Sequence, residues 1–127
     1  MRRTVPLLLI FLLFLSCNSP SPGQVKNGPL SPNNEPFNRR SELVFTKHAR
    51  CRMDCRHITT KEIHEVLNNG SINFSKSEPN SRPDPKYAVE GYTAENQHLR
   101  IIVAPEETKL IIITCIELGV EWSCHCN

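Results

Sequence analysis

Four of the six cysteines in this 127-residue chain form two close pairs, and these pairs restrict the fold more than any other feature. The first pair is Cys51-x-x-x-Cys55 and the second is Cys124-x-Cys126. On a helix, positions i and i+4 have Cβ atoms roughly 6 Å apart, too far for an unstrained mutual disulfide. A Cys-x-Cys tail is equally awkward to close on itself. Pairing the two sets with each other would bring the C-terminal tail onto the first helix.

Two arrangements of these cysteines meet that requirement. In one, Cys51, Cys55, Cys124 and Cys126 supply four thiolates to a zinc ion, with sulfur at about 2.3 Å and no open position for catalysis. In the other, one or two disulfides link the helix pair to the tail pair, as is common outside the cytosol. His125, between the tail cysteines, is an alternative metal ligand. Either arrangement would staple a small core.

The N-terminus predicts export. Arg2 and Arg3 precede an apolar stretch, residues 5–15, that is too short to span a bilayer of about 30 Å. A positive start followed by a short apolar stretch is typical of a signal segment. We therefore expect residues 1–16 to be a signal peptide.

Residues 13–17, LFLSC, resemble a bacterial lipobox, in which a small residue precedes a cysteine that is lipidated and becomes the mature N-terminus. The resemblance implies a lipid on Cys17 and a protein anchored to a membrane. Phe14 stands where the lipobox usually has leucine, and the alternative is ordinary cleavage after Ser16 with Cys17 left as a free thiol. Several acyl chains would hold the protein stably, because each buried methylene contributes about 0.8 kcal/mol.

Three segments follow from composition. Residues 1–16 are the predicted leader, residues 17–40 a lipidated cysteine and a Pro-rich tether, and residues 41–127 the folded domain. Within 41–127, 10 Lys and Arg face 12 Asp and Glu, a net charge of −2. The domain therefore lacks the globally basic character of most nucleic-acid-binding proteins.

Hydrophobic periodicity predicts an α+β fold. We expect a short strand at 42–45, a helix over 46–55, and a second helix that begins with a capping box, Thr59 with Glu62, and ends at Asn69-Gly70. Strands are expected at 72–74, 86–93, 99–103 and 110–116, the last of them an inner strand with Cys115 buried. The prediction is two N-terminal helices packed on a mainly antiparallel sheet of about four strands.

Several of these segments resemble an uncharacterised bacterial family, domain of unknown function 4258. The resemblance rests on the run Phe45-Thr-Lys-His-Ala-Arg-Cys-Arg-Met53 with its HARxRM motif, on Arg56-His-Ile58, on the helix ending at Asn69-Gly70, and on a late strand reaching Ile113-Thr114. It covers most of residues 43–116. It implies a small α+β domain placed near the RelE and colicin-type ribonuclease toxins, and it implies no catalytic residues.

The predicted first helix also carries the basic segment of the domain. Residues 47–61 hold five Lys and Arg against one acid, Asp54, a local charge of +4. His48, Arg52 and Arg56 recur every four residues and should share one side of the helix. In a metal-independent ribonuclease, His48 could deprotonate a 2′-hydroxyl while Arg52 stabilises the phosphorane.

The alternative is a structural role for this face. In that interpretation His48 packs or hydrogen-bonds at the helix start, and the arginines pair with acids such as Glu90 or Glu117. RNA is also scarce outside the membrane, so nucleic acid is not the expected partner.

The leading functional hypothesis is a lipid-anchored, non-enzymatic protein of the cell envelope. Its domain would bind a protein or another envelope component from the periplasmic side or the cell surface. The absence of Asp at position 18 favours the outer membrane. The alternatives are a RelE-like or colicin-like ribonuclease using the His48 and Arg52 face, and a zinc-binding or redox module.

Overall fold

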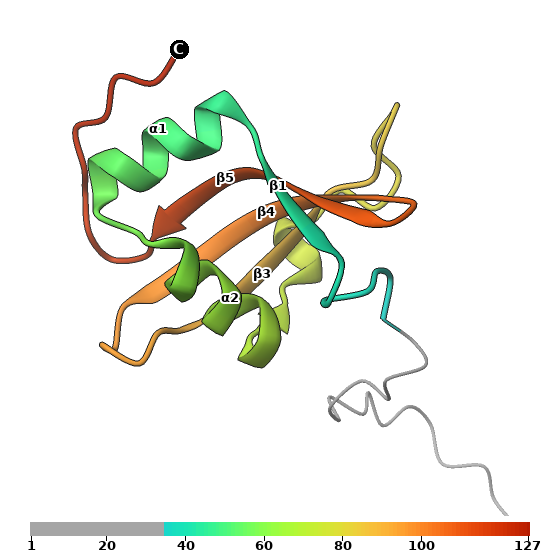
Figure 1. Cartoon of the computed structure of the whole chain (residues 1–127), viewed down its shortest axis with the longest axis horizontal. Helices are drawn as coiled ribbons and strands as arrows, with labels where there is room; N and C mark the ends of the chain where they lie inside the picture. Colours follow the sequence, from blue (N-terminus) through green and yellow to red (C-terminus); the bar gives the residue numbers. More distant parts are fainter. Residues whose placement is uncertain (1–34) are drawn as a thin grey trace, which may run out of the picture. The chain divides into compact units, whose positions relative to one another are not determined.

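A computed structural model describes residues 35–127 of the protein. The predicted signal peptide, Cys17 and most of the predicted tether lie outside these residues. Figure 1 shows an α+β fold with two α-helices and one sheet. The elements are β1 (Glu42–Phe45), α1 (Lys47–Arg56), α2 (Thr60–Asn69), β2 (Ser71–Ile72), a short 3-10 helix η1 (Phe74–Lys76), β3 (Tyr87–Tyr92), β4 (His98–Glu106) and β5 (Lys109–Glu117).

The sheet has five strands in the order β1-β5-β4-β3-β2. The expectation of about four antiparallel strands was therefore slightly wrong, because β1 joins as a fifth strand and lies parallel to β5, with Leu43 opposite Leu110. The other neighbours are antiparallel, as predicted. Sequence periodicity identified the 42–45 strand but carried no information about its partner. As predicted, β5 is an inner strand.

Both helices pack against one face of the sheet (Figure 1), α1 over β5 and α2 over β3 and β4. The inward positions of the strands alternate as expected for a half-buried sheet. Cys115 is among them, fully buried as predicted. The fully buried core comprises Ala49, Ile63, Val66, Leu67, Ala88, Val89, Leu99, Ile101, Val103, Leu110, Ile112 and Cys115.

The second helix is specified by its own sequence. Its capping box is formed: the Thr59 hydroxyl accepts a hydrogen bond from the Glu62 amide, and the Thr59 amide donates to the Glu62 carboxylate at 2.7 Å. Gly70 ends the helix in an extended conformation. A Cβ at Gly70 would lie 2.5 Å from the carbonyl oxygens of both Glu90 and Val66. Glycine is therefore required where the end of α2 passes close to β3.

The first helix starts at a similar cap but lacks an apolar stripe. The Thr46 hydroxyl accepts from the Ala49 amide at 3.0 Å and donates to the Ile113 carbonyl at 3.1 Å, which ties the helix start to β5. Only Ala49 and Met53 of its ten residues are buried. His57 ends the helix in the left-handed conformation, with φ 54°.

The packed region begins before residue 41, the predicted start of the folded domain. Phe37 is buried, and its ring lies 5.5 Å from the ring of Tyr87. Arg39 donates hydrogen bonds to the carbonyls of Leu67 and Gly70 and pairs with Glu35. These contacts close the C-terminal end of α2.

No helix within residues 35–127 combines the length and the apolar character that a membrane crossing requires.

Candidate functional site

Two disulfides join the C-terminal tail to α1. Cys51 pairs with Cys126 and Cys55 with Cys124, with Cα atoms 5.8 Å and 5.9 Å apart. Both separations lie in the usual range for disulfides. The prediction that the two pairs need each other is confirmed, and the disulfide alternative is the one observed. The tail passes over α1 in the opposite chain direction (Figure 1).

The spacing of the cysteines explains why both bonds form together. Four residues of helix rise about 6 Å, and two residues of extended chain span about 6.6 Å. Cys51 and Cys55 therefore present their side chains at nearly the interval at which Cys124 and Cys126 present theirs. The Cys-x-x-x-Cys and Cys-x-Cys motifs are complementary in length.

Trp122 packs where the tail turns toward α1. Its ring meets His57 edge to face, with centroids 5.6 Å apart, and its indole nitrogen donates to Glu117 at 2.9 Å. The tail is therefore held by aromatic and polar contacts as well as by the two disulfides.

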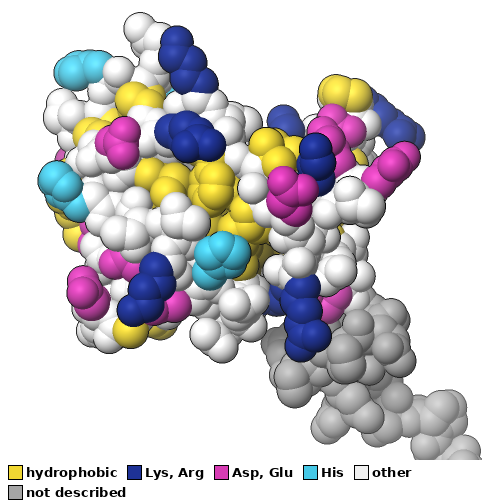
Figure 2. All heavy atoms as spheres, in the orientation of Figure 1, with side chains coloured by type: hydrophobic (Ala, Val, Ile, Leu, Met, Phe, Trp, Pro, Cys, Tyr) yellow, Lys and Arg dark blue, Asp and Glu magenta, His cyan; other side chains and the backbone are white. Residues whose placement is uncertain are grey.

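His48 and Arg52 lie together on α1, as their spacing predicted. Arg52 Nε donates to His48 Nε2 at 3.3 Å. Both side chains are half-buried, whereas Lys47 and Arg50 on the same helix are exposed. Arg50 lies over the Phe45 ring, 5.7 Å from its centroid. Figure 2 shows Lys and Arg side chains beside exposed hydrophobic atoms on this face of the molecule.

Arg56 is turned toward the sheet. Its Nη1 donates to the carbonyl oxygen of Cys115, on the edge of β5 that β1 does not cover. Its Nε is buried without a hydrogen-bond partner. Burial, followed by the charge of Arg52, lowers the pKa of Arg56. Arg56 thus closes an open strand edge, which removes it from direct chemistry at the His48 and Arg52 pair.

The acid partners expected for these arginines are occupied elsewhere. Glu90 accepts from Arg100 and Asn73, and Glu117 accepts from Trp122. The ion pairs of residues 35–127 are Arg39–Glu35, Lys61–Glu65, Lys86–Glu78 and Arg100–Glu90, and none includes a cation of α1. The prediction that Glu90 or Glu117 forms an ion pair with the α1 arginines was wrong. Arg100 on β4 and Asn73 in the loop after β2 donate to Glu90. Trp122 in the tail donates to Glu117, which acts on Arg56 only through its charge.

Cys115 is a free thiol, separate from the disulfides. It is fully buried on the inner face of β5. Burial raises the pKa of Cys115 to about 11, against smaller opposing effects from Arg56 and Arg52. At neutral pH it is a protonated core residue, in keeping with the sequence prediction.

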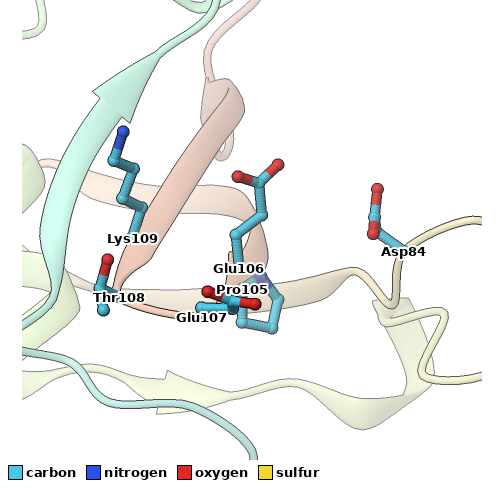
Figure 3. A pocket seen from close by; sticks show the side chains of 6 residues that line it. All are labelled: Asp84, Pro105, Glu106, Glu107, Thr108 and Lys109. Carbon is cyan, nitrogen blue, oxygen red and sulfur yellow. The ribbon is translucent and has the colours of Figure 1, made fainter.

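An open pocket of about 570 Å³ lies at the other end of the sheet, beside the turn between β4 and β5. Figure 3 shows Asp84 on a loop that faces this turn, with Glu106 and Lys109 on the strands that flank it. Its remaining lining residues are Pro105, Glu107 and Thr108. None of the residues singled out from the sequence lines this pocket, and its charged side chains are exposed.

In the disulfide form the sulfurs of Cys51, Cys55, Cys124 and Cys126 form two S–S bonds and are not thiolate ligands. Across residues 35–127, no group of three or more His, Cys, Asp or Glu side chains is arranged to hold a metal ion. The zinc prediction concerns the reduced cysteines and stays a prediction.

Two groups of contacts were missed by the sequence analysis. Phe37 and Arg39 were assigned to the tether, although an aromatic residue within an otherwise polar, Pro-rich stretch is a signal for a packing site. The link between Trp122, His57 and Glu117 joins residues from three segments, and no local pattern reports it.

Comparison with known proteins gave one match. Searches of curated proteins and of solved structures found none. The family described as "Domain of unknown function (DUF4258)" matches residues 45–117, which run from the end of β1 through β5 and include α1 with its two cysteines. The match covers more than half of the chain. The matched range agrees with the resemblance expected from the sequence, which covered most of residues 43–116. The chain belongs to this family of uncharacterised domains.

Proposed function

We propose that this protein is a lipid-anchored, non-enzymatic component of the bacterial cell envelope whose C-terminal domain is a binding module. The single observation that carries the proposal is the pair of disulfides between α1 and the tail. Disulfides persist in oxidising compartments outside the cytosol. The lipobox-like LFLSC segment supports an anchor on Cys17.

The surface of α1 supports a partner that carries negative charge. Lys47 and Arg50 are exposed on this helix, and among residues 35–127 they have no acidic partner. Surface cations of this kind attract acidic ligands and steer their approach.

The test is to express the full chain in a bacterium that processes lipoproteins and to supply an alkyne-tagged fatty acid. We expect the tag in the envelope fraction, attached to the protein and lost in Cys17→Ser but kept in the matched control Cys115→Ser. Peptide mapping without reduction should recover Cys51 linked to Cys126 and Cys55 linked to Cys124. An untagged protein, or four free staple thiols in envelope material, would contradict the proposal.

A second candidate function is RNA cleavage, favoured by the contact between His48 and Arg52. A histidine with a neighbouring guanidinium has the groups that metal-independent phosphodiester cleavage needs. Incubating the purified protein with labelled RNA tests this candidate. Cleavage should be lost in His48→Ala and kept in His64→Ala, which changes an exposed histidine on α2. Absence of cleavage by the unaltered protein would remove this candidate.

A further inference from the structure

The disulfides place four sulfur-bearing residues around one small area. Cys51 and Cys55 are one helical turn apart on α1, and each lies opposite one tail cysteine at a Cα separation below 6 Å. The four residues are therefore the corners of a rectangle with sides of about 6 Å. The rest of the fold, including Trp122 and β5, fixes where the tail crosses the helix.

A rectangle of this size suits a tetrahedral metal ion once the sulfur–sulfur bonds are broken. Zinc binds thiolate sulfur at about 2.3 Å, so its four sulfur ligands lie about 4 Å from one another. A helical i, i+4 pair directs both side chains to the same side, as a chelating pair requires. We propose that the reduced protein binds one Zn²⁺ through Cys51, Cys55, Cys124 and Cys126, and that disulfide formation releases it.

The cations of α1 are a second, independent observation. Arg50 and Arg52 adjoin Cys51 in the chain, and Arg56 adjoins Cys55. None has an acidic partner among residues 35–127. A zinc ion with four thiolates carries a net charge of −2, and nearby Arg side chains stabilise thiolates. Arg56 is held by the Cys115 carbonyl. Arg50 and Arg52 form no ion pair within residues 35–127, and a negatively charged metal site beside Cys51 would give them one.

The exchange between the two forms balances with a disulfide as oxidant. Four zinc-bound thiolates lose four electrons and form the Cys51–Cys126 and Cys55–Cys124 bonds. Two partner disulfides accept these electrons and become four thiolates, and Zn²⁺ leaves. A dithiol reductant reverses the exchange. The four cysteines then hold the tail on α1 in both forms, through disulfides when oxidised and through the metal ion when reduced.

The proposal deepens the proposed function, since it concerns the same staple, but it is independent of the lipid on Cys17. Cys115 takes no part, because it is buried on the inner face of β5. His125 is exposed between the two tail cysteines and could replace a thiolate.

The experiment reduces the full chain with a phosphine in the absence of oxygen and titrates it with Co²⁺. Cobalt in a tetrahedral thiolate site absorbs in the near ultraviolet and in the red, so the spectrum reports the ligands directly. We expect one Co²⁺ per chain, displaced by one Zn²⁺, and release of the metal when oxidised glutathione is added. A reduced protein that shows no thiolate-to-cobalt band would overturn the proposal, whether or not it stays folded.

Matched variants separate a built site from loose binding to thiols. Cys55→Ser or Cys124→Ser should weaken zinc binding by more than the roughly 10- to 100-fold loss that follows removal of an outer partner. Cys17→Ser and Cys115→Ser should leave the spectrum and the stoichiometry unchanged. His125→Ala should also leave the spectrum and the stoichiometry unchanged. Loss of the thiolate-to-cobalt band in His125→Ala would count against four thiolate ligands. Binding of one Co²⁺ per chain that persists in Cys55→Ser would also count against them.

The arginines supply a further readout. Arg52→Gln should lower the affinity of the reduced protein for zinc, whereas Lys76→Gln, which removes a cation outside α1, should not. These results are separate from the lipid-labelling test, so a missing anchor and a missing zinc site would be recognised independently.

Discussion

The two helices have the same length and adjoin in the chain, yet they are held in place by different means. α2 buries Ile63, Val66 and Leu67 on one stripe and begins with a complete capping box. α1 buries only Ala49 and Met53 and is tied to the rest of the molecule by two disulfides and by Arg56. Covalent and polar links can replace an apolar stripe, and they leave the surface of the helix free for charged side chains.

The largest expected effect comes from removing both disulfides. A disulfide that closes a loop of 75 or 69 residues stabilises a protein by about 4.5 kcal/mol, and a second one inside the same ring adds about 2 kcal/mol. Removing either bond with paired Cys→Ala changes should therefore cost about 2 kcal/mol, because the other keeps the large loop closed. Removing both should cost about 7 kcal/mol.

Urea unfolding of the two double variants and of the quadruple variant measures these losses. Single-bond losses of about 4.5 kcal/mol each would mean that the bonds do not share one loop. The buffer is metal-free and contains a chelator, so that zinc cannot bind the remaining cysteines and change the measured stability.

The next largest effect tests the apolar stripe of α2. Leu67→Ala should lower the free energy of unfolding by about 2 to 5 kcal/mol, because it removes a buried side chain and leaves a cavity. Asn68→Ala changes the exposed neighbouring residue and should cost no more than about 0.5 kcal/mol. Similar losses for the two variants, measured by urea unfolding, would show that α2 is not held by its stripe.

A smaller effect is expected at the helix caps. Thr59→Ala should cost about 1 kcal/mol, since it leaves the Glu62 amide without its side-chain acceptor. Both hydroxyls also donate a hydrogen bond, Thr59 to the Glu62 carboxylate of its own helix and Thr46 to the Ile113 carbonyl of β5. Thr46→Ala should cost more, because only the Thr46 bond joins the helix to the sheet. Serine at either position should restore most of the lost stability. Thermal unfolding measures both losses. A larger loss for Thr59→Ala than for Thr46→Ala would show that the hydrogen bond to β5 is unimportant.

The last prediction is a dependence of stability on alkaline pH, which is absent at neutral pH, where the thiol is protonated in both the folded and the unfolded state. Burial raises the pKa of Cys115 to about 11 from the ordinary value of 9.0. As pH rises from 9 to 11, the thiol ionises in the unfolded chain but stays protonated in the folded protein, so the folded state loses stability over this window. Cys115→Val should lose less stability between these pH values than the unaltered protein. Parallel curves in urea unfolding would show that the thiol is accessible in the folded state.

Much of α2 could be predicted because its signals are local. The capping box links residues three apart, and the apolar stripe repeats within one turn, so Thr59, Glu62 and Leu67 carry their own information. The strands at 86–93 and 110–116 were identified by the same kind of pattern. Their observed bounds differ by one residue at each end, where pairing with a neighbour extends or shortens a strand.

The candidate site could be predicted only in part. Its members were visible as cysteine pairs and as a row of His48, Arg52 and Arg56. The hydrogen-bond partner of Arg56 could not be predicted. The Cys115 carbonyl can accept its hydrogen bond because β1 pairs with β5 only as far as Ile112. The acids thought to neutralise the row were already bound to Arg100 and Trp122, partners that lie on β4 and in the tail.

By itself the sequence determined the family, the second helix, the alternation of the main strands, and the need of each cysteine pair for a partner outside itself. These properties depend on residues within a few positions of one another. Tertiary structure alone decided that β1 runs parallel to β5 and that Cys51 meets Cys126 and Cys55 meets Cys124. It also decided that the cations of α1 form no ion pair within residues 35–127. Such choices join residues up to 75 positions apart, and they depend on the direction in which the tail crosses the helix, which no local preference sets.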